Sequence, residues 1–108
     1  MPRVQDTIGV IFDFDGTLVP DSITALLRRH RIDPKRFWLK DAKKLTDQGY
    51  DQVHAYLNLL LRNIGPKKPL GNLTNDNLRS FGSTLRLYPG IPKVFDDLKK
   101  LGEMNGVE

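Results

Sequence analysis

The first informative pattern is an almost unbroken run of apolar and β-branched residues from Thr7 to Phe14, interrupted by Asp13. A run of this kind is typical of a strand buried on both faces, such as a central strand of a parallel sheet. Such a strand needs neighbours, yet no other segment has a convincing strand pattern. Val107-Glu108 lies where a second strand would begin, after a helix of crossover length. We therefore expect an α/β fold of which this chain carries only the front part.

Beyond residue 20 the apolar positions follow helical spacing. Asp21-Ser22 can cap a helix that ends among Arg28, Arg29 and Arg31, and Asp33-Pro34 opens a second helix that runs toward Gly49. The clearest helix extends from Asp51 to Asn63 and stops at Gly65-Pro66. Its expected buried stripe consists of Val53, Tyr56, Leu57, Leu60, Leu61 and Ile64.

Two further helices are expected toward the end of the chain. Thr74 caps a short one that contains Leu78 and Phe81, and Pro92 opens another that ends at Gly102. The second of these has an expected buried stripe of Val94, Phe95, Leu98 and Leu101. The stretch from Pro66 to Asn72 between helices is expected to be a loop.

The composition of the chain excludes several classes of function. The chain has no cysteine, which excludes a disulfide framework, a thiolate zinc site and a cysteine nucleophile within these residues. Its net charge of +4 comes from scattered pairs such as Lys43-Lys44, so a nucleic-acid partner is not indicated. No apolar stretch reaches the roughly 20 residues needed to cross a bilayer. We expect a soluble, cytoplasmic protein without a membrane partner, and the sequence leaves its oligomeric state open.

Asp13 and Asp15 are the residues most suited to chemistry. Because side chains alternate along a strand, both carboxylates would point to the same side at the carboxyl edge of the sheet, where α/β proteins bind ligands. Two carboxylates this close repel each other unless a cation offsets their charge. The pair therefore fits either a divalent metal site or an acid/base couple, and phosphoryl transfer can use both.

The run from Val10 to Leu18, VIFDFDGTL, resembles the first motif of the haloacid dehalogenase superfamily, an apolar strand that leads into D-x-D-G-T-L. Leu87 to Pro92, followed by Leu98 to Gly102, is similar to the stretch where that family's chain returns from an inserted cap to the core. The resemblance implies a Rossmann-like α/β core, here with only its first strand and crossover helix, at residues 1–20 and 87–108. Residues 21–86 would form an inserted helical cap that closes over the site and selects the substrate.

By this resemblance Asp13 is the nucleophile that forms an aspartyl-phosphate, and it also binds Mg²⁺. Asp15 is the general acid and base, and its backbone carbonyl is a further metal ligand. Thr17 helps to orient Asp15, and Gly16 allows the tight turn. The aspartate at position 15 favours a phosphatase over a dehalogenase, because the family's dehalogenases lack an acid there.

The family's later motifs have no counterpart in these residues: a strand that ends in Ser or Thr, a phosphate-binding lysine and a second acidic pair. We therefore expect negligible activity from this chain alone. The leading hypothesis is a Mg²⁺-dependent phosphomonoesterase acting on a small phosphorylated metabolite. The rival is a non-catalytic remnant whose helices, from Asp33 to Phe81, bind a partner while Asp13 is idle.

Other interpretations of the conspicuous residues are less specific. An EF-hand calcium loop is excluded because Gly16 comes too early and Thr24 stands where the bidentate glutamate belongs. A nucleotide-sugar transferase also uses Asp-x-Asp but does not require Gly-Thr-Leu after it. His30 and His54 lack a second ligand at metal spacing, and Trp38 with Phe37 is expected in the helical core.

Overall fold

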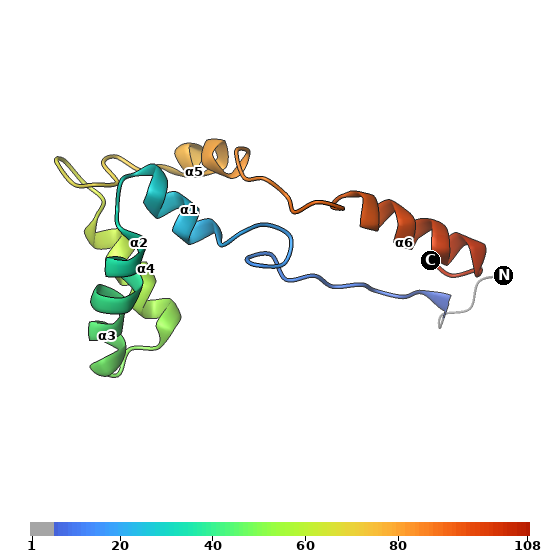
Figure 1. Ribbon diagram of the computed structural model, residues 1–108, viewed down its shortest axis with the longest axis horizontal. Coiled ribbons are helices and arrows are strands. Elements are labelled where there is room, and N and C mark those ends of the chain that lie inside the picture. The colour runs from blue at the N-terminus through green and yellow to red at the C-terminus, as the bar shows by residue number, and fades with distance from the viewer. Residues whose placement is uncertain (1–5) are drawn as a thin grey trace. The chain divides into compact units, whose positions relative to one another are not determined.

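The computed structural model describes residues 6–108 and shows a helical protein (Figure 1). Just over half of these residues are helical. Residues 1–5 of the expected core range lie outside the described residues. The elements are α1 (Ser22–Arg29), α2 (Pro34–Arg36), the π-helix η2 (Phe37–Ala42), α3 (Lys43–Asp47), α4 (Gln52–Arg62), α5 (Asn75–Gly82) and α6 (Lys93–Met104).

The chain divides into two units. One comprises Met1–Asp21 with Arg86–Glu108, and the other comprises Ser22–Leu85. We call the second the helical unit, because it holds α1 to α5, and the first the terminal unit, because it holds both ends of the chain. The two boundaries between the units each lie one residue from a boundary that the sequence predicted between core and cap. The assignment of the two parts as a core and a cap stays a prediction.

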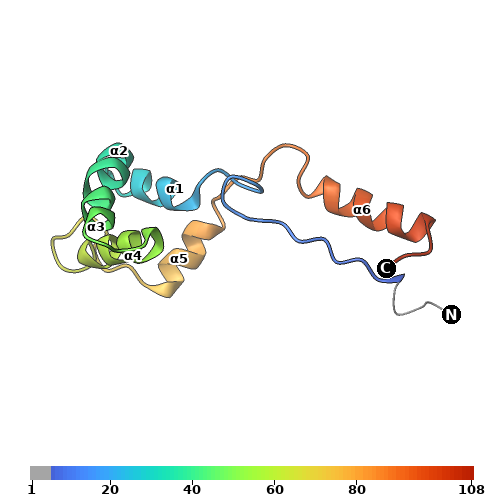
Figure 2. The ribbon, with the colours of Figure 1, turned by 90° about the horizontal axis from the view of Figure 1, so that it is seen from below.

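The helical unit has an apolar core. Six of its side chains are buried together: Leu27, Phe37, Ala42, Leu45, Ala55 and Leu59. Trp38 packs against this cluster, its ring 5.0 Å from that of Phe37 and its Nε1 donating to Thr24 Oγ1 at 3.1 Å. The expectation that Phe37 and Trp38 belong to the helical core is confirmed. In both views the segment from α2 to α3 lies beside α4 (Figures 1 and 2).

The helix expected after Asp33-Pro34 is present, with a π-helical middle. Asp33 caps it by accepting from the backbone N–H of Lys35 at 3.0 Å, and Pro34 occupies its first turn. Because a π-helix bonds each amide to the carbonyl five residues earlier, Phe37 and Ala42 fall on the same side, and both are buried. The irregular turn therefore places both residues in the core.

The helix expected between Asp51 and Asn63 is confirmed as α4, but its predicted buried stripe is only partly right. The buried positions are Ala55 and Leu59, with Tyr56 and Leu60 packed beside them. Val53, Leu57 and Leu61 are exposed. Apolar residues occupy two sides of this helix, so spacing alone did not identify the side that meets η2 and α3.

The expected α/β fold is wrong. Among residues 6–108 no strand forms, and the segment from Thr7 to Phe14 is extended but unpaired along most of its length. Ile11 is 95% exposed, and Ile8, Val10 and Phe14 are also exposed. A strand is stabilised by ladder bonds to its neighbours, and no other described segment supplies them. The Rossmann-like core is therefore not formed. The helices do form, because each of them makes its backbone hydrogen bonds within its own segment.

One pair of backbone bonds joins the ends of the terminal unit. Glu108 N–H donates to the Asp6 carbonyl at 2.9 Å, and Ile8 N–H donates to the Glu108 carbonyl at 2.9 Å. This is the pattern of a single parallel rung. It involves Glu108, as the position expected for a second strand suggested, but within the described residues it does not extend into a ladder.

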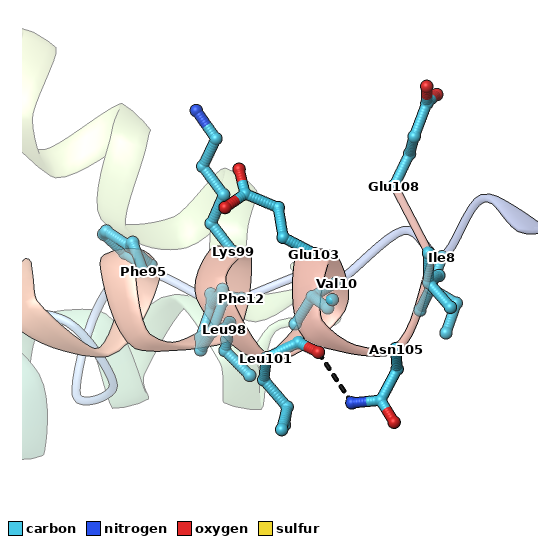
Figure 3. Close-up of a pocket in the computed structure, with 12 residues that line it drawn as sticks. Ile8, Val10, Phe12, Phe95, Leu98, Lys99, Leu101, Glu103, Asn105 and Glu108 are labelled. Carbon is cyan, nitrogen blue, oxygen red and sulfur yellow. Dashed lines mark hydrogen bonds between the residues drawn. The ribbon is translucent and has the colours of Figure 1, made fainter.

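α6 lies beside the extended segment across an apolar cavity of about 710 Å³. Phe12 meets Phe95 edge to face, with ring centroids 5.2 Å apart, and Leu98 and Leu101 line the cavity with them (Figure 3). The buried stripe expected on this helix is wrong, because Phe95 and Leu101 are exposed and no residue of α6 is buried. A single extended segment is too narrow to cover the apolar side of a helix.

None of the helices in residues 6–108 combines the length and apolar character required to cross a bilayer.

Candidate functional site

The acidic pair lies where the extended segment enters a tight turn. The Phe14 carbonyl accepts from the backbone N–H groups of Thr17 at 3.2 Å, Leu18 at 2.9 Å and Val19 at 3.3 Å. Gly16 donates to the Val19 carbonyl at 2.7 Å and has a positive φ of 73°. This conformation favours glycine because it has no Cβ. Four backbone bonds therefore fix the chain immediately beside both aspartates.

The turn is anchored at its far end. Val19 is 1% exposed, and the Leu18 carbonyl accepts from Tyr88 N–H at 2.9 Å. This bond ties the turn to the Tyr88-Pro89-Gly90 stretch of the same terminal unit. The two sequence stretches that carried the family resemblance are thus hydrogen-bonded to each other.

The four residues predicted for the site are close together in the chain and all exposed: Asp13, Asp15, Gly16 and Thr17. Asp13 ends the extended segment, whereas Asp15 forms an isolated bridge with Val19 across the turn. The aspartates are therefore reachable from solvent. Their roles as nucleophile and acid stay predictions.

The donor set beside the turn suits Mg²⁺ chemically. Two carboxylates and the Asp15 carbonyl are hard oxygen ligands, and Mg²⁺ commonly keeps several waters in its coordination shell. The described part of the chain groups no three acidic, histidine or cysteine side chains that could hold a metal. A cation here would rely on the pair, on backbone carbonyls and on water.

A second carboxylate interaction, at Asp51, serves the helix instead. Asp51 caps α4, accepting from His54 N–H at 3.0 Å and pairing with the His54 ring. The pKa of Asp51 is lowered from its usual value, first by the bond from the His54 backbone and then by that from its side chain. His54 thus has a local partner in the carboxylate that caps α4.

The helical unit also contains a cavity, bounded by α1 and α5, that the sequence did not predict. Arg29, His30 and Phe81 are among the residues that line it. The Arg29 guanidinium lies 5.7 Å from the centroid of the Phe81 ring. From the sequence, Arg28, Arg29 and Arg31 could either reach a substrate phosphate from the cap or be charges at a helix end, and the helix end was favoured. No local signal connected Arg29 to Phe81.

No family model, no curated protein and no solved structure matches this chain. The haloacid dehalogenase resemblance therefore stays a prediction that depends on the motif from Val10 to Leu18.

Proposed function

We propose that the chain carries the nucleophile and the general acid of a Mg²⁺-dependent phosphomonoesterase that acts on a small phosphorylated metabolite in the cytoplasm. The observation that carries the proposal is the pair Asp13 and Asp15, exposed at the end of an extended segment and beside a turn fixed by four backbone bonds. Fixed backbone geometry favours catalysis because the reacting groups need little reorganisation.

The proposed reaction has two steps. A carboxylate oxygen of Asp13 attacks phosphorus while the bond from phosphorus to the leaving oxygen breaks, and protonated Asp15 gives that oxygen its proton. Water then attacks the aspartyl-phosphate, Asp15 takes a proton from the water, and the bond between Asp13 and phosphorus breaks. Phosphate leaves and both aspartates return to their starting states.

The Asp13 carboxylate and the Asp15 backbone carbonyl would hold Mg²⁺, which would offset the negative charge of the phosphoryl group when bound. Without such a cation, the Asp13 carboxylate and the phosphate would repel each other. Gly16 and Thr17 support the pair through the turn.

The nucleophile is tested by phosphoryl trapping. In any longer form of the protein that carries a phosphate-binding lysine and a second acidic pair, we expect Mg²⁺-dependent phosphate release from p-nitrophenyl phosphate. Asp13→Asn should abolish it, whereas Asp15→Asn should slow it and let the Asp13 phosphoryl adduct accumulate, as detected by mass spectrometry. Continued turnover by the Asp13→Asn protein would refute the assignment.

The matched controls are Asp96→Asn and Asp97→Asn, which remove acids from the exposed first half of α6 in the same unit. Both should retain wild-type turnover. The 108-residue chain by itself should release negligible phosphate, because none of its residues matches the family's phosphate-binding hydroxyl or its charge-neutralising lysine.

A second function, a helical interaction module, is favoured by one observation. Val53, Leu57 and Leu61 form an exposed apolar stripe along α4, on which they are spaced one turn apart. Exposed apolar patches often mark protein-binding sites. Under this hypothesis Leu57→Ser with Leu61→Ser would remove partner binding, and Asp13→Asn would change nothing measurable.

A further inference from the structure

The cavity of the helical unit, between the end of α1 and α5, has a volume of about 300 Å³. This is at the lower end of the range for small-molecule sites, roughly 300–1,000 Å³. Buried Leu26 and Leu70 supply apolar surface, and Phe81 is partly buried. The polar residues that line the cavity are Arg29, His30, Asn72, Asn77 and Ser80. Apolar surface beside a few polar groups is the usual composition of a ligand site.

Arg29 is exposed but makes two contacts beside this cavity. Its Nη1 donates to Thr84 Oγ1 at 3.4 Å, and its guanidinium faces the Phe81 ring at 5.7 Å. The Thr84 hydroxyl in turn donates to the Phe81 carbonyl at 2.6 Å, which fixes the acceptor. A side chain already ordered before binding loses less conformational entropy when a ligand arrives. The guanidinium has five N–H donors, so these contacts leave donors for an anion.

The charge of the unit also favours an anion. Residues 22–85 contain twelve lysines and arginines against five aspartates, a formal net charge of +7. No acidic residue lines the cavity. Asp76, at the start of α5, lies 4.0 Å from Arg79, which offsets its charge. An anion entering the cavity therefore meets a positive potential.

We propose that this cavity binds a small organic anion, whose carboxylate or phosphate group pairs with Arg29 while its apolar portion rests on Leu26 and Leu70. The planar guanidinium can donate two parallel bonds to either group. The site requires no chemistry at Asp13, so it stands or falls separately from the phosphomonoesterase proposal.

The test is a titration of the full 108-residue chain, followed by ¹H–¹⁵N NMR at physiological salt. Benzoate and phenyl phosphate present the two anionic groups on one ring, and benzyl alcohol is the neutral control. We expect at least one anion to give saturable shifts at the amides of Arg29, His30 and Phe81, and the tighter ligand identifies the preferred group. Benzyl alcohol should bind at least roughly tenfold more weakly, because it cannot form charge-assisted bonds to Arg29.

Arg29→Gln should weaken the binding of the anion roughly tenfold or more, because a hydrogen-bonded charge pair is lost. Arg28→Gln is the matched control: Arg28 and Arg29 are both exposed, so it removes the same charge at the neighbouring position, but Arg28 does not line the cavity. Its effect should be about twofold or less at this salt concentration. Thr84→Val, which removes the hydroxyl that holds Arg29, should weaken binding by an intermediate factor and provides a second test if Arg29→Gln loses its helical signal.

Three results would overturn the proposal. They are shifts that do not saturate with either anion, equal losses in Arg28→Gln and Arg29→Gln, and equal affinity for benzyl alcohol and the anions. Equal losses would mean that the anion senses only the diffuse charge of the unit.

Discussion

Asp51 links the charge of one residue to the stability of one helix. Its pKa is lowered because its carboxylate accepts from the His54 backbone and pairs with the His54 ring. A lowered folded-state pKa means that the stabilisation is fully present above the usual pKa and is lost as pH falls through the lowered value. The charge of Asp51 therefore stabilises α4 at neutral pH and stops doing so in acid.

This predicts how Asp51→Asn behaves. The amide oxygen can still cap α4, but it does not titrate. Wild type should exceed the variant in Tm at neutral pH, and the difference should shrink below about pH 4, where the carboxylate becomes protonated. Thermal unfolding followed by far-UV circular dichroism measures both proteins. A difference that grows in acid would contradict the assigned direction.

Unlike Asp51, which is exposed, Phe37 is 2% exposed and lies in the helical core. Phe37→Ala should cost about 3–5 kcal/mol in the free energy of unfolding, from lost burial and the cavity left behind. The control is Leu39→Ala, two residues along the same π-helix but 70% exposed, which should change stability by less than about 0.5 kcal/mol. Urea unfolding distinguishes them, and similar losses in both variants would contradict the core assignment.

At the scale of elements, α5 depends on its first turn. The Thr74 hydroxyl accepts from Asn77 N–H at 3.2 Å, and the Asn77 side chain accepts from Thr74 N–H at 2.9 Å, forming a capping box. Thr74→Ala should destabilise this helix by about 1 kcal/mol, whereas Thr74→Ser should retain most of the cap. Amide exchange in Leu78 and Phe81 reports the difference. Equal exchange in the two variants would show that the box contributes nothing.

Helix positions were predictable because their signals are local. Asp33, Asp51 and Thr74 each cap the helix expected at that place, and Pro34 stands in the first turn of its helix. The buried side of α4 was not predictable, because apolar residues occupy both of its sides and only tertiary contacts choose between them. The prediction of a strand was wrong for a related reason. A strand depends on a partner segment, and the pattern of Thr7 to Phe14 carries no information about one.

At the scale of the whole molecule, the two units differ in how well they bury their apolar residues. Ala55 is fully buried in the helical unit, whereas Val10 is 55% exposed in the terminal unit. Backbone amides of residues 9–14 form no hydrogen bond with another described residue. They should exchange with solvent orders of magnitude faster than those of Ala55 and Leu59. Slow exchange at Val10 or Phe12 would contradict the unpaired segment.

The candidate functional residues were likewise predictable only where their signal is local. Asp13, Asp15 and Gly16 were identifiable because one short motif contains them and their turn. The cavity beside Arg29 was not, because Leu26, Leu70 and Thr84 are far apart in sequence and only the fold brings them near. The bond between Leu18 and Tyr88 was equally invisible, although each of its ends belonged to a recognisable stretch.

Whether Asp13 and Asp15 together hold a magnesium ion can be measured by a Mg²⁺ titration of the 108-residue chain followed by ¹H–¹⁵N NMR. We expect saturable shifts confined to residues 12–18, strongly weakened in Asp13→Asn, less weakened in Asp15→Asn, which keeps the backbone carbonyl, and unchanged in Asp96→Asn. Shifts that are absent, or that persist when both aspartates are replaced, would contradict this magnesium site.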